Sequence, residues 1–188
     1  MRIFQQAKLA LPRIWLMSDE RLGDDFLGAI KRLPFSSGII FRHYSLDDTQ
    51  RRKLYREVRR IAKRRGHVIL LSGDVRVAIR WHADGVHDRG RRQRVPVNMI
   101  HAAPVHNLQE MAEAKRAGAD MILLSPLYPT ASHSGAAALG QHGFAQLTGL
   151  APMPVIALGG MNRRRGAMLD KRRVHGWAAI SAFYKKGK

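Results

Sequence analysis

The stretch Val155-Ile156-Ala157-Leu158-Gly159-Gly160-Met161 joins a short apolar run to two consecutive glycines. An apolar run of this length that ends at a glycine turn is typical of a buried strand in a parallel sheet. Gly159 and Gly160 would let the backbone approach an anion closely and direct N–H groups at it, near the start of a helix. A tight strand-to-helix turn without a ligand is the alternative interpretation. The stretch therefore predicts a strand-turn-helix unit with a candidate phosphate site.

The rest of the chain repeats this unit, because short apolar runs alternate with amphipathic helical patterns. The expected strands cover residues 14–17, 39–41, 68–71, 84–87, 98–102, 121–124, 155–158 and 177–180. The expected helices cover residues 25–33, 45–65 with Ser45 as N-cap, 75–82 and 107–117, with a short helix near Phe144. This repetition predicts an α/β fold, a (β/α)8 TIM-type barrel, with a doubly wound open sheet as the rival.

The barrel should be compact, because 188 residues is short for a fold that usually needs roughly 200 or more. Residues 88–96 show no apolar periodicity, so the fourth helical unit is predicted to be abbreviated. Only residues 184–188 remain for the eighth helical unit, which should be abbreviated too. We therefore expect one TIM-barrel domain over residues 1–188, with 1–10 as an N-terminal extension and 184–188 as a basic tail.

Positive charge dominates the composition, with 33 lysines and arginines against 14 acidic residues and a net charge of +19. Such an excess favours anionic partners, such as phosphorylated metabolites, nucleic acid or an acidic surface. Arginines concentrate in residues 51–65, 89–94 and 163–173. These stretches are either solvated outer faces or an RNA-binding surface. Arg163 or Arg164 could also touch a phosphate at the glycine turn.

Several classes of protein are excluded by what the sequence lacks. The absence of cysteine excludes disulfides, thiolate metal sites and a cysteine nucleophile. The sequence contains no run of about 18 apolar residues, so no membrane span is predicted. Pro12 and Arg13 interrupt the apolar stretch near the start, unlike a secretory signal. We therefore expect a cytoplasmic protein without a membrane partner, while homo-oligomerisation is left open.

In a parallel barrel, ligands bind at the carboxyl ends of the strands. Four histidines lie at or near predicted strand ends, His43, His87, His106 and His133. They form either a metal cluster or a polar rim, and no regular ligand spacing favours the metal. The residues that this rule selects are Asp19, Arg42, Ser72 to Asp74, His87, Pro104 to His106, Ser125 to His133, Gly159 to Asn162, and Ser181.

Five motifs together resemble the thiamine phosphate synthase/TenI family in order and spacing. They are Ala83–His87 (ADGVH), Ala117–Asp120 (AGAD), Ser125–Thr130 (SPLYPT), Pro154–Met161 (PVIALGGM) and Ile180–Ala182 (ISA). The resemblance extends over about residues 11–183. It implies a (β/α)8 barrel that joins a hydroxymethylpyrimidine diphosphate to a thiazole phosphate. That reaction needs Mg²⁺ and cationic side chains around the departing diphosphate.

The resemblance implies that the half of the site that binds the thiazole phosphate is retained. The matching positions are Thr130 and Ser132 in the family's Thr-x-Thr loop, Gly159 and Gly160 at its phosphate glycines, and Ile180 with Ser181 at its final phosphate turn. A small phosphorylated metabolite is therefore the expected ligand.

The half that binds the pyrimidine diphosphate departs from the family. Arg42 matches the arginine of its Gln-x-Arg-x-Lys strand, but Ile40 and Tyr44 replace the glutamine and the lysine. The carboxylates expected to hold Mg²⁺ are replaced at Gly73 and Arg92, so we assign no metal ligand. The other departures are Ser72 for asparagine, Pro104 for serine, His133 for lysine, and Ser125 for the histidine of the tautomerase branch.

These observations leave more than one function open. An active transferase, thiamine phosphate synthase, would displace diphosphate with Arg42 and His133 neutralising the leaving group. A non-catalytic barrel would bind the phosphate ligand alone. A polyanion-binding module would bind RNA through its arginines. No cofactor is assigned with certainty.

Overall fold

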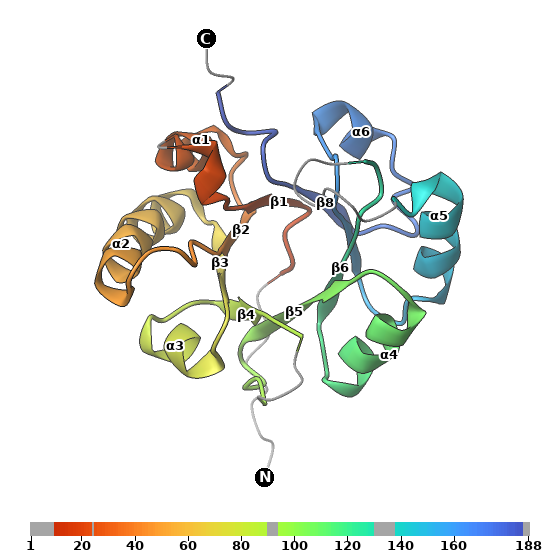
Figure 1. Cartoon of the computed structure of the whole chain (residues 1–188), viewed down its shortest axis with the longest axis horizontal. Helices are drawn as coiled ribbons and strands as arrows, with labels where there is room; N and C mark the ends of the chain where they lie inside the picture. Colours follow the sequence, from red (N-terminus) through yellow and green to blue (C-terminus); the bar gives the residue numbers. More distant parts are fainter. Residues whose placement is uncertain (1–9, 24, 90–93, 130–137, 186–188) are drawn as a thin grey trace.

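The computed structural model describes residues 10–23, 25–89, 94–129 and 138–185. Within them, eight strands close into a barrel in the order β1 to β8 (Figure 1). The strands are β1 (Ile14–Met17), β2 (Gly38–Phe41), β3 (Val68–Ser72), β4 (Gly85–His87), β5 (Ile100–Val105), β6 (Met121–Leu124), β7 (Val155–Ala157) and β8 (Gly176–Ala179). Each strand pairs in parallel with the next, and β8 pairs with β1. The predicted (β/α)8 barrel is confirmed, and the alternative prediction of a doubly wound open sheet is wrong.

Apolar side chains fill the interior of the barrel, because alternate residues of each strand point inward. Trp15 and Met17 of β1 lie there with Ile40 of β2 in one buried cluster. The indole Nε1 of Trp15 donates to the carbonyl oxygen of Pro12 at 2.7 Å. Gly38 on the neighbouring strand makes room, since a Cβ there would lie 2.0 Å from the Trp15 ring. This packing fills the interior of the barrel, so a ligand of the strand ends would bind at the rim.

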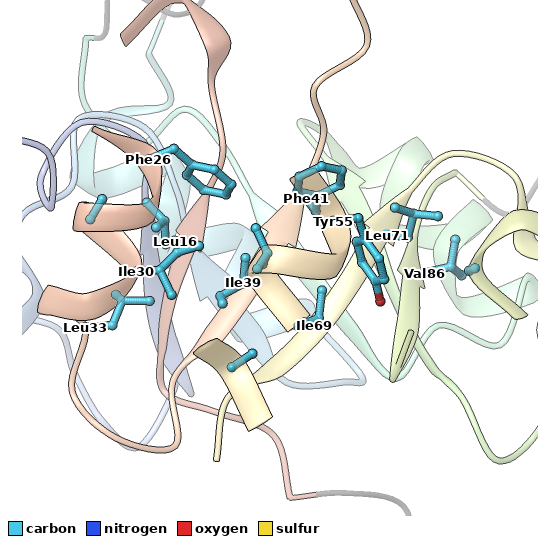
Figure 2. Close-up of a cluster of buried hydrophobic side chains, with 14 of the residues drawn as sticks. Leu16, Phe26, Ile30, Leu33, Ile39, Phe41, Tyr55, Ile69, Leu71 and Val86 are labelled. Carbon is cyan, nitrogen blue, oxygen red and sulfur yellow. The ribbon is translucent and has the colours of Figure 1, made fainter. Parts of the chain in front are cut away.

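The helices cover the outside of the barrel in a ring (Figure 1). They are α1 (Phe26–Arg32), α2 (Asp48–Arg65), α3 (Val75–Arg80), α4 (Leu108–Arg116), α5 (Gly140–Leu150) and α6 (Arg163–Ala167), with a 3-10 turn, η1 (Glu20–Leu22). Figure 2 shows how the outward side chains Leu16, Ile39 and Ile69 meet Ile30 of α1 and Tyr55 of α2 in one apolar layer. None of the described helices is long and apolar enough to cross a membrane.

The fourth and eighth helical units are abbreviated, as predicted. The described residues between β4 and β5 contain no helix, and those after β8 form turns. Figure 1 shows the resulting interval between α3 and α4. Other boundaries differ from the prediction: β5 begins at Ile100 and runs to Val105, and α5 has 11 residues instead of being short.

The predicted N-cap of the second helix is wrong. Asp47 caps α2, and its carboxylate accepts from the backbone N–H of Gln50 at 2.8 Å. The Ser45 hydroxyl instead contacts the carboxylate of Glu20 in η1. Because Glu20 is 25 residues away in the chain, local sequence could not show that it draws Ser45 away from the helix.

Two aspartates of the family-like motifs have a structural role at the starts of strands. The carboxylate of Asp84, just before β4, accepts from the N–H of Ile69 at 2.7 Å. The carboxylate of Asp120, just before β6, accepts from the N–H of His101 at 2.8 Å. Each side chain thus fastens its strand to the preceding one, so these motifs support the barrel at the end opposite the candidate site.

Candidate phosphate-binding site

The glycine turn follows β7 at the carboxyl end of the barrel. Gly159 has a φ of +96° and Gly160 a φ of +61°, backbone conformations that favour glycine. Space is limited as well, because a Cβ on Gly159 would lie 2.6 Å from the Cα of Pro126 and one on Gly160 would lie 2.9 Å from the Cβ of Tyr128. Both glycines are therefore required by the turn, whose backbone packs closely against Pro126, Tyr128 and Arg165.

The glycine turn is joined to the loop that follows β6. The N–H of Leu127 donates to the carbonyl oxygen of Leu158 at 2.9 Å, and the N–H of Tyr128 donates to that of Gly159 at 3.2 Å. This loop continues toward Thr130, Ser132 and His133, which lie outside the described residues, as does Arg92. The start of the family-like Pro-Leu-Tyr-Pro-Thr segment and the glycine turn thus form one unit.

Arg165 is the cation that contacts the turn. Its Nη1 donates to the carbonyl oxygen of Gly160, and its guanidinium carbon lies 4.2 Å from the centre of the Tyr128 ring. The arginines predicted to touch a phosphate here were Arg163 or Arg164. Arg163 lines a different cavity beside Trp177, and Arg164 is exposed. The signal that was missed is the N-cap: Asn162 accepts from the N–H of Arg165 and fixes this residue in the first turn of α6.

The Ile180–Ser181 turn follows β8, the strand that pairs with β7. Ile180 is partly buried against the interior apolar cluster, whereas Ser181 is exposed. The Ser181 carbonyl oxygen accepts from the N–H of Tyr184 at 3.1 Å, which closes this turn. The Gly159–Gly160 turn and the Ile180–Ser181 turn therefore leave neighbouring strands at the same rim.

Arg42 lies at the rim after β2, but it already has partners in the segment that follows β1. Its Nε donates to the carbonyl oxygen of Ser18 at 2.7 Å, and its Nη2 lies 3.3 Å from the Asp19 carboxylate. Hydrogen bonds from Arg21, and then the charge of Arg42, lower the pKa of Asp19 and keep it ionised. These residues line a cavity of about 200 Å³. A resident carboxylate therefore offsets part of the charge that Arg42 could offer to a diphosphate.

Ser72 and His87 form a polar pair at the ends of the adjacent strands β3 and β4. The Ser72 hydroxyl and the Nδ1 of His87 are 2.9 Å apart. Burial, and then the charge of Arg42, lower the pKa of His87 to about 4, so the imidazole is neutral near pH 7. Its Nε2 is buried and has no hydrogen-bond partner among the residues that the structure describes. Both residues were predicted at the rim, but their pairing depends on the contact between β3 and β4.

The residues at the ends of β3 and β4 do not fit the Mg²⁺ that the resemblance implies. Mg²⁺ prefers carboxylate oxygens, but Gly73 has a φ of +120°, at which an aspartate would be strained even with open space around its Cβ. Asp74 instead caps α3, where its carboxylate accepts from the N–H of Arg76 at 2.6 Å. Asp88 lies 3.0 Å from the Nε2 of His101.

The described rim histidines each contact a different partner. His43 lies 3.0 Å from the Ser18 hydroxyl, and His106 lies 2.8 Å from the Glu110 carboxylate. Within the part of the chain that the structure describes, no three His, Cys, Asp or Glu side chains come together as a metal site. His43, His87 and His106 therefore act as separate polar groups.

Comparisons with known proteins agree with one another. A family model described as thiamine monophosphate synthase matches residues 35–183. A protein of Aquifex aeolicus (strain VF5), provisionally named thiamine-phosphate synthase 2, is 30% identical over 93% of this chain and 99% of its own. The thiamine-phosphate synthase of Pyrococcus furiosus is 25% identical over 90% of this chain and 86% of its own. A solved structure of thiamine phosphate pyrophosphorylase from Pyrococcus furiosus has the same fold, with a TM-score of 0.78 at 24% identity and coverage of 90% and 86%.

Proposed function

This chain belongs to the thiamine monophosphate synthase family, and we propose that it binds a thiazole phosphate, or a similar small phosphorylated metabolite, at the Gly159–Gly160 turn. The observation that carries the proposal is the joined pair of loops after β6 and β7. In the family that this chain resembles, these two loops hold the thiazole phosphate. The proposal keeps the cytoplasmic location expected from the sequence.

The chemistry of the turn suits a dianionic group. A backbone without side chains lets phosphate oxygens approach N–H donors closely. Arg165 lies in contact with Gly160 and could turn its guanidinium from the carbonyl to a phosphate oxygen. Ser181, exposed on the neighbouring strand end, offers a hydroxyl donor. Thr130 and Ser132 are proposed to complete the site from the loop that begins at Tyr128.

A second candidate function is transferase activity, which the synthase relatives favour. In that reaction the thiazole nitrogen would form a bond to the methylene carbon of the pyrimidine, and the bond from this carbon to the diphosphate oxygen would break. Arg42 and His133 would neutralise the leaving diphosphate, and the buried Nε2 of His87 would offer a hydrogen bond to the pyrimidine side. Because the described residues do not fit Mg²⁺, we assign no step to a metal.

Calorimetry with thiazole phosphate and with thiamine phosphate tests the binding proposal. We expect Gly160→Asp to weaken binding roughly tenfold or more, because a carboxylate would repel the phosphate and displace Tyr128 or Arg165. Gly118→Asp is the matched control, since Gly118 also has a positive φ but open space around it, near the end of α4. Ser181→Asp, at an exposed position, tests the site without strain on the glycine turn. Unchanged affinity in both Gly160→Asp and Ser181→Asp would contradict the proposal.

A coupled assay with both substrates, with and without Mg²⁺, separates the two functions. Turnover that does not need Mg²⁺ would support transfer assisted by basic side chains. No turnover in either condition, together with retained thiazole phosphate binding, would leave the binding function alone. Absence of both turnover and binding would overturn the proposed function.

A further inference from the structure

The outer face of α2 carries positive charge that the rim of the barrel does not use. The helix contains nine basic residues and two acidic residues in 18 positions. Its apolar side chains Tyr55, Val58 and Ala62 are buried against the barrel, so most of the basic side chains are exposed on the opposite face. Arg51 and Arg65 are half-buried instead and donate to backbone carbonyl oxygens of other segments. The long helix thus presents a row of cations on the surface of the molecule.

Part of this row forms one wall of a groove between α2 and α3, with a volume of about 510 Å³. Four cations line it together with one aromatic ring and one acid. These residues, called the α2–α3 groove below, are Arg52, Lys53, Arg56, Arg80, Trp81 and Asp48. A cavity of this size with several cations and a single carboxylate is suited to an anionic ligand.

The cations of the groove are available for a partner. The ion pairs between described residues involve other side chains, and none includes Arg52, Lys53, Arg56 or Arg80. Arg52, Arg56 and Arg60 also follow one another at four-residue spacing, which places like charges side by side and destabilises an isolated helix. A bound polyanion would offset this repulsion.

The aromatic ring identifies the kind of polyanion. Trp81 is half-buried: its ring centre lies 5.1 Å from that of Tyr55 and 5.5 Å from the guanidinium carbon of Arg51, and its remaining surface lines the groove. A partly exposed aromatic ring beside a track of cations is an arrangement that suits single-stranded nucleic acid, because a base can contact the ring while the cations hold phosphates. A membrane surface would need outward apolar residues on the helix, but the apolar residues of α2 are buried or half-buried against the barrel.

We propose that the α2–α3 groove binds single-stranded nucleic acid, with the phosphates on Arg52, Lys53, Arg56 and Arg80 and a base against Trp81. The groove lies on the outside of the barrel, so this function is independent of the phosphate site at the rim. Four phosphate contacts predict that the logarithm of the binding constant falls with the logarithm of salt concentration at a slope of about −3.

Fluorescence anisotropy with a labelled, unstructured RNA of about 20 nucleotides tests the location of binding. We expect Arg52→Glu with Arg56→Glu to weaken binding roughly tenfold and to reduce the salt slope. Lys171→Glu with Arg172→Glu is the matched control, because it changes the net charge equally in a loop that lines another cavity. The control should weaken binding only about twofold. Equal losses in the two variants would assign the attraction to net charge and overturn the proposal.

Tryptophan fluorescence tests the stacking contact directly. Trp15 and Trp177 are buried, with 0% and 7% of their surface exposed, so RNA should quench mainly the emission of Trp81. The quenching should disappear in Trp81→Phe, which should still bind. RNA binding without quenching in the parent protein would contradict the stacking. Equal affinity for a duplex of the same length, or stronger binding to vesicles that contain anionic lipid, would overturn the assignment to a single strand.

Discussion

At the residue scale, the buried imidazole of His87 makes the stability of the barrel depend on pH. Because its pKa is about 4 in the folded protein and near 6.5 in an unfolded chain, the unfolded state binds the proton first as the pH falls. The stabilisation is therefore present above about pH 6.5 and is lost between that value and about pH 4. Between pH 7 and pH 5, we expect the free energy of unfolding of the parent protein to drop by ~2 kcal/mol more than that of the His87→Asn variant. Urea unfolding at the two pH values measures this difference.

The control variant is His82→Asn, at an exposed position with a positive φ. It should keep the pH dependence of unfolding that the parent protein shows. The same pH dependence in His87→Asn would contradict the assignment.

At the element scale, the N-terminus of α2 depends on Asp47 rather than on Ser45. The Asp47 carboxylate satisfies a backbone N–H that has no partner within the helix, and its charge is favourable at the positive end of the helix dipole. We expect Asp47→Ala to lower the free energy of unfolding by ~1 kcal/mol and to reduce helix content at the start of α2. Ser45→Ala is the comparison, because its hydroxyl contacts Glu20 and not the helix. Thermal unfolding followed by circular dichroism distinguishes them, and a larger effect of Ser45→Ala would contradict the cap assignment.

At the scale of the whole molecule, a net charge of +19 makes the folded state repel itself. Salt should screen this repulsion, so we expect the midpoint of thermal unfolding to rise by about 2–4 °C between low salt and about 0.3 M NaCl, equivalent to ~1 kcal/mol. Arg60→Glu with Arg64→Glu, two like-charged neighbours on α2, should raise the midpoint at low salt and flatten its salt dependence. Differential scanning calorimetry across a salt series provides the measurement. A midpoint that falls as salt is added would show that attractive ion pairs dominate instead.

The prediction of the fold succeeded because its signals are local. Each strand is a short apolar run, and each turn is marked by glycine, aspartate or serine nearby in the chain, so the alternation of units was visible without tertiary contacts. The two abbreviated helical units were predictable for the same reason, since residues 88–96 lack apolar periodicity. The Gly159–Gly160 turn was predictable too, because the positive φ angles that it requires restrict the choice of residue.

Local sequence was thus sufficient for the barrel, for its glycine turn and for the loss of the expected carboxylates at Gly73 and Arg92. The partners of several charged side chains were set only when distant segments packed together. Arg42 is held by Ser18 and Asp19, which lie 24 and 23 residues earlier in the chain. Strand periodicity repeats every two residues and can be read along the chain, whereas the partner of a long charged side chain depends on which loops meet at the rim. Closure of the barrel made Arg42 a paired cation and left the cations of the α2–α3 groove without an ion pair to any other described residue.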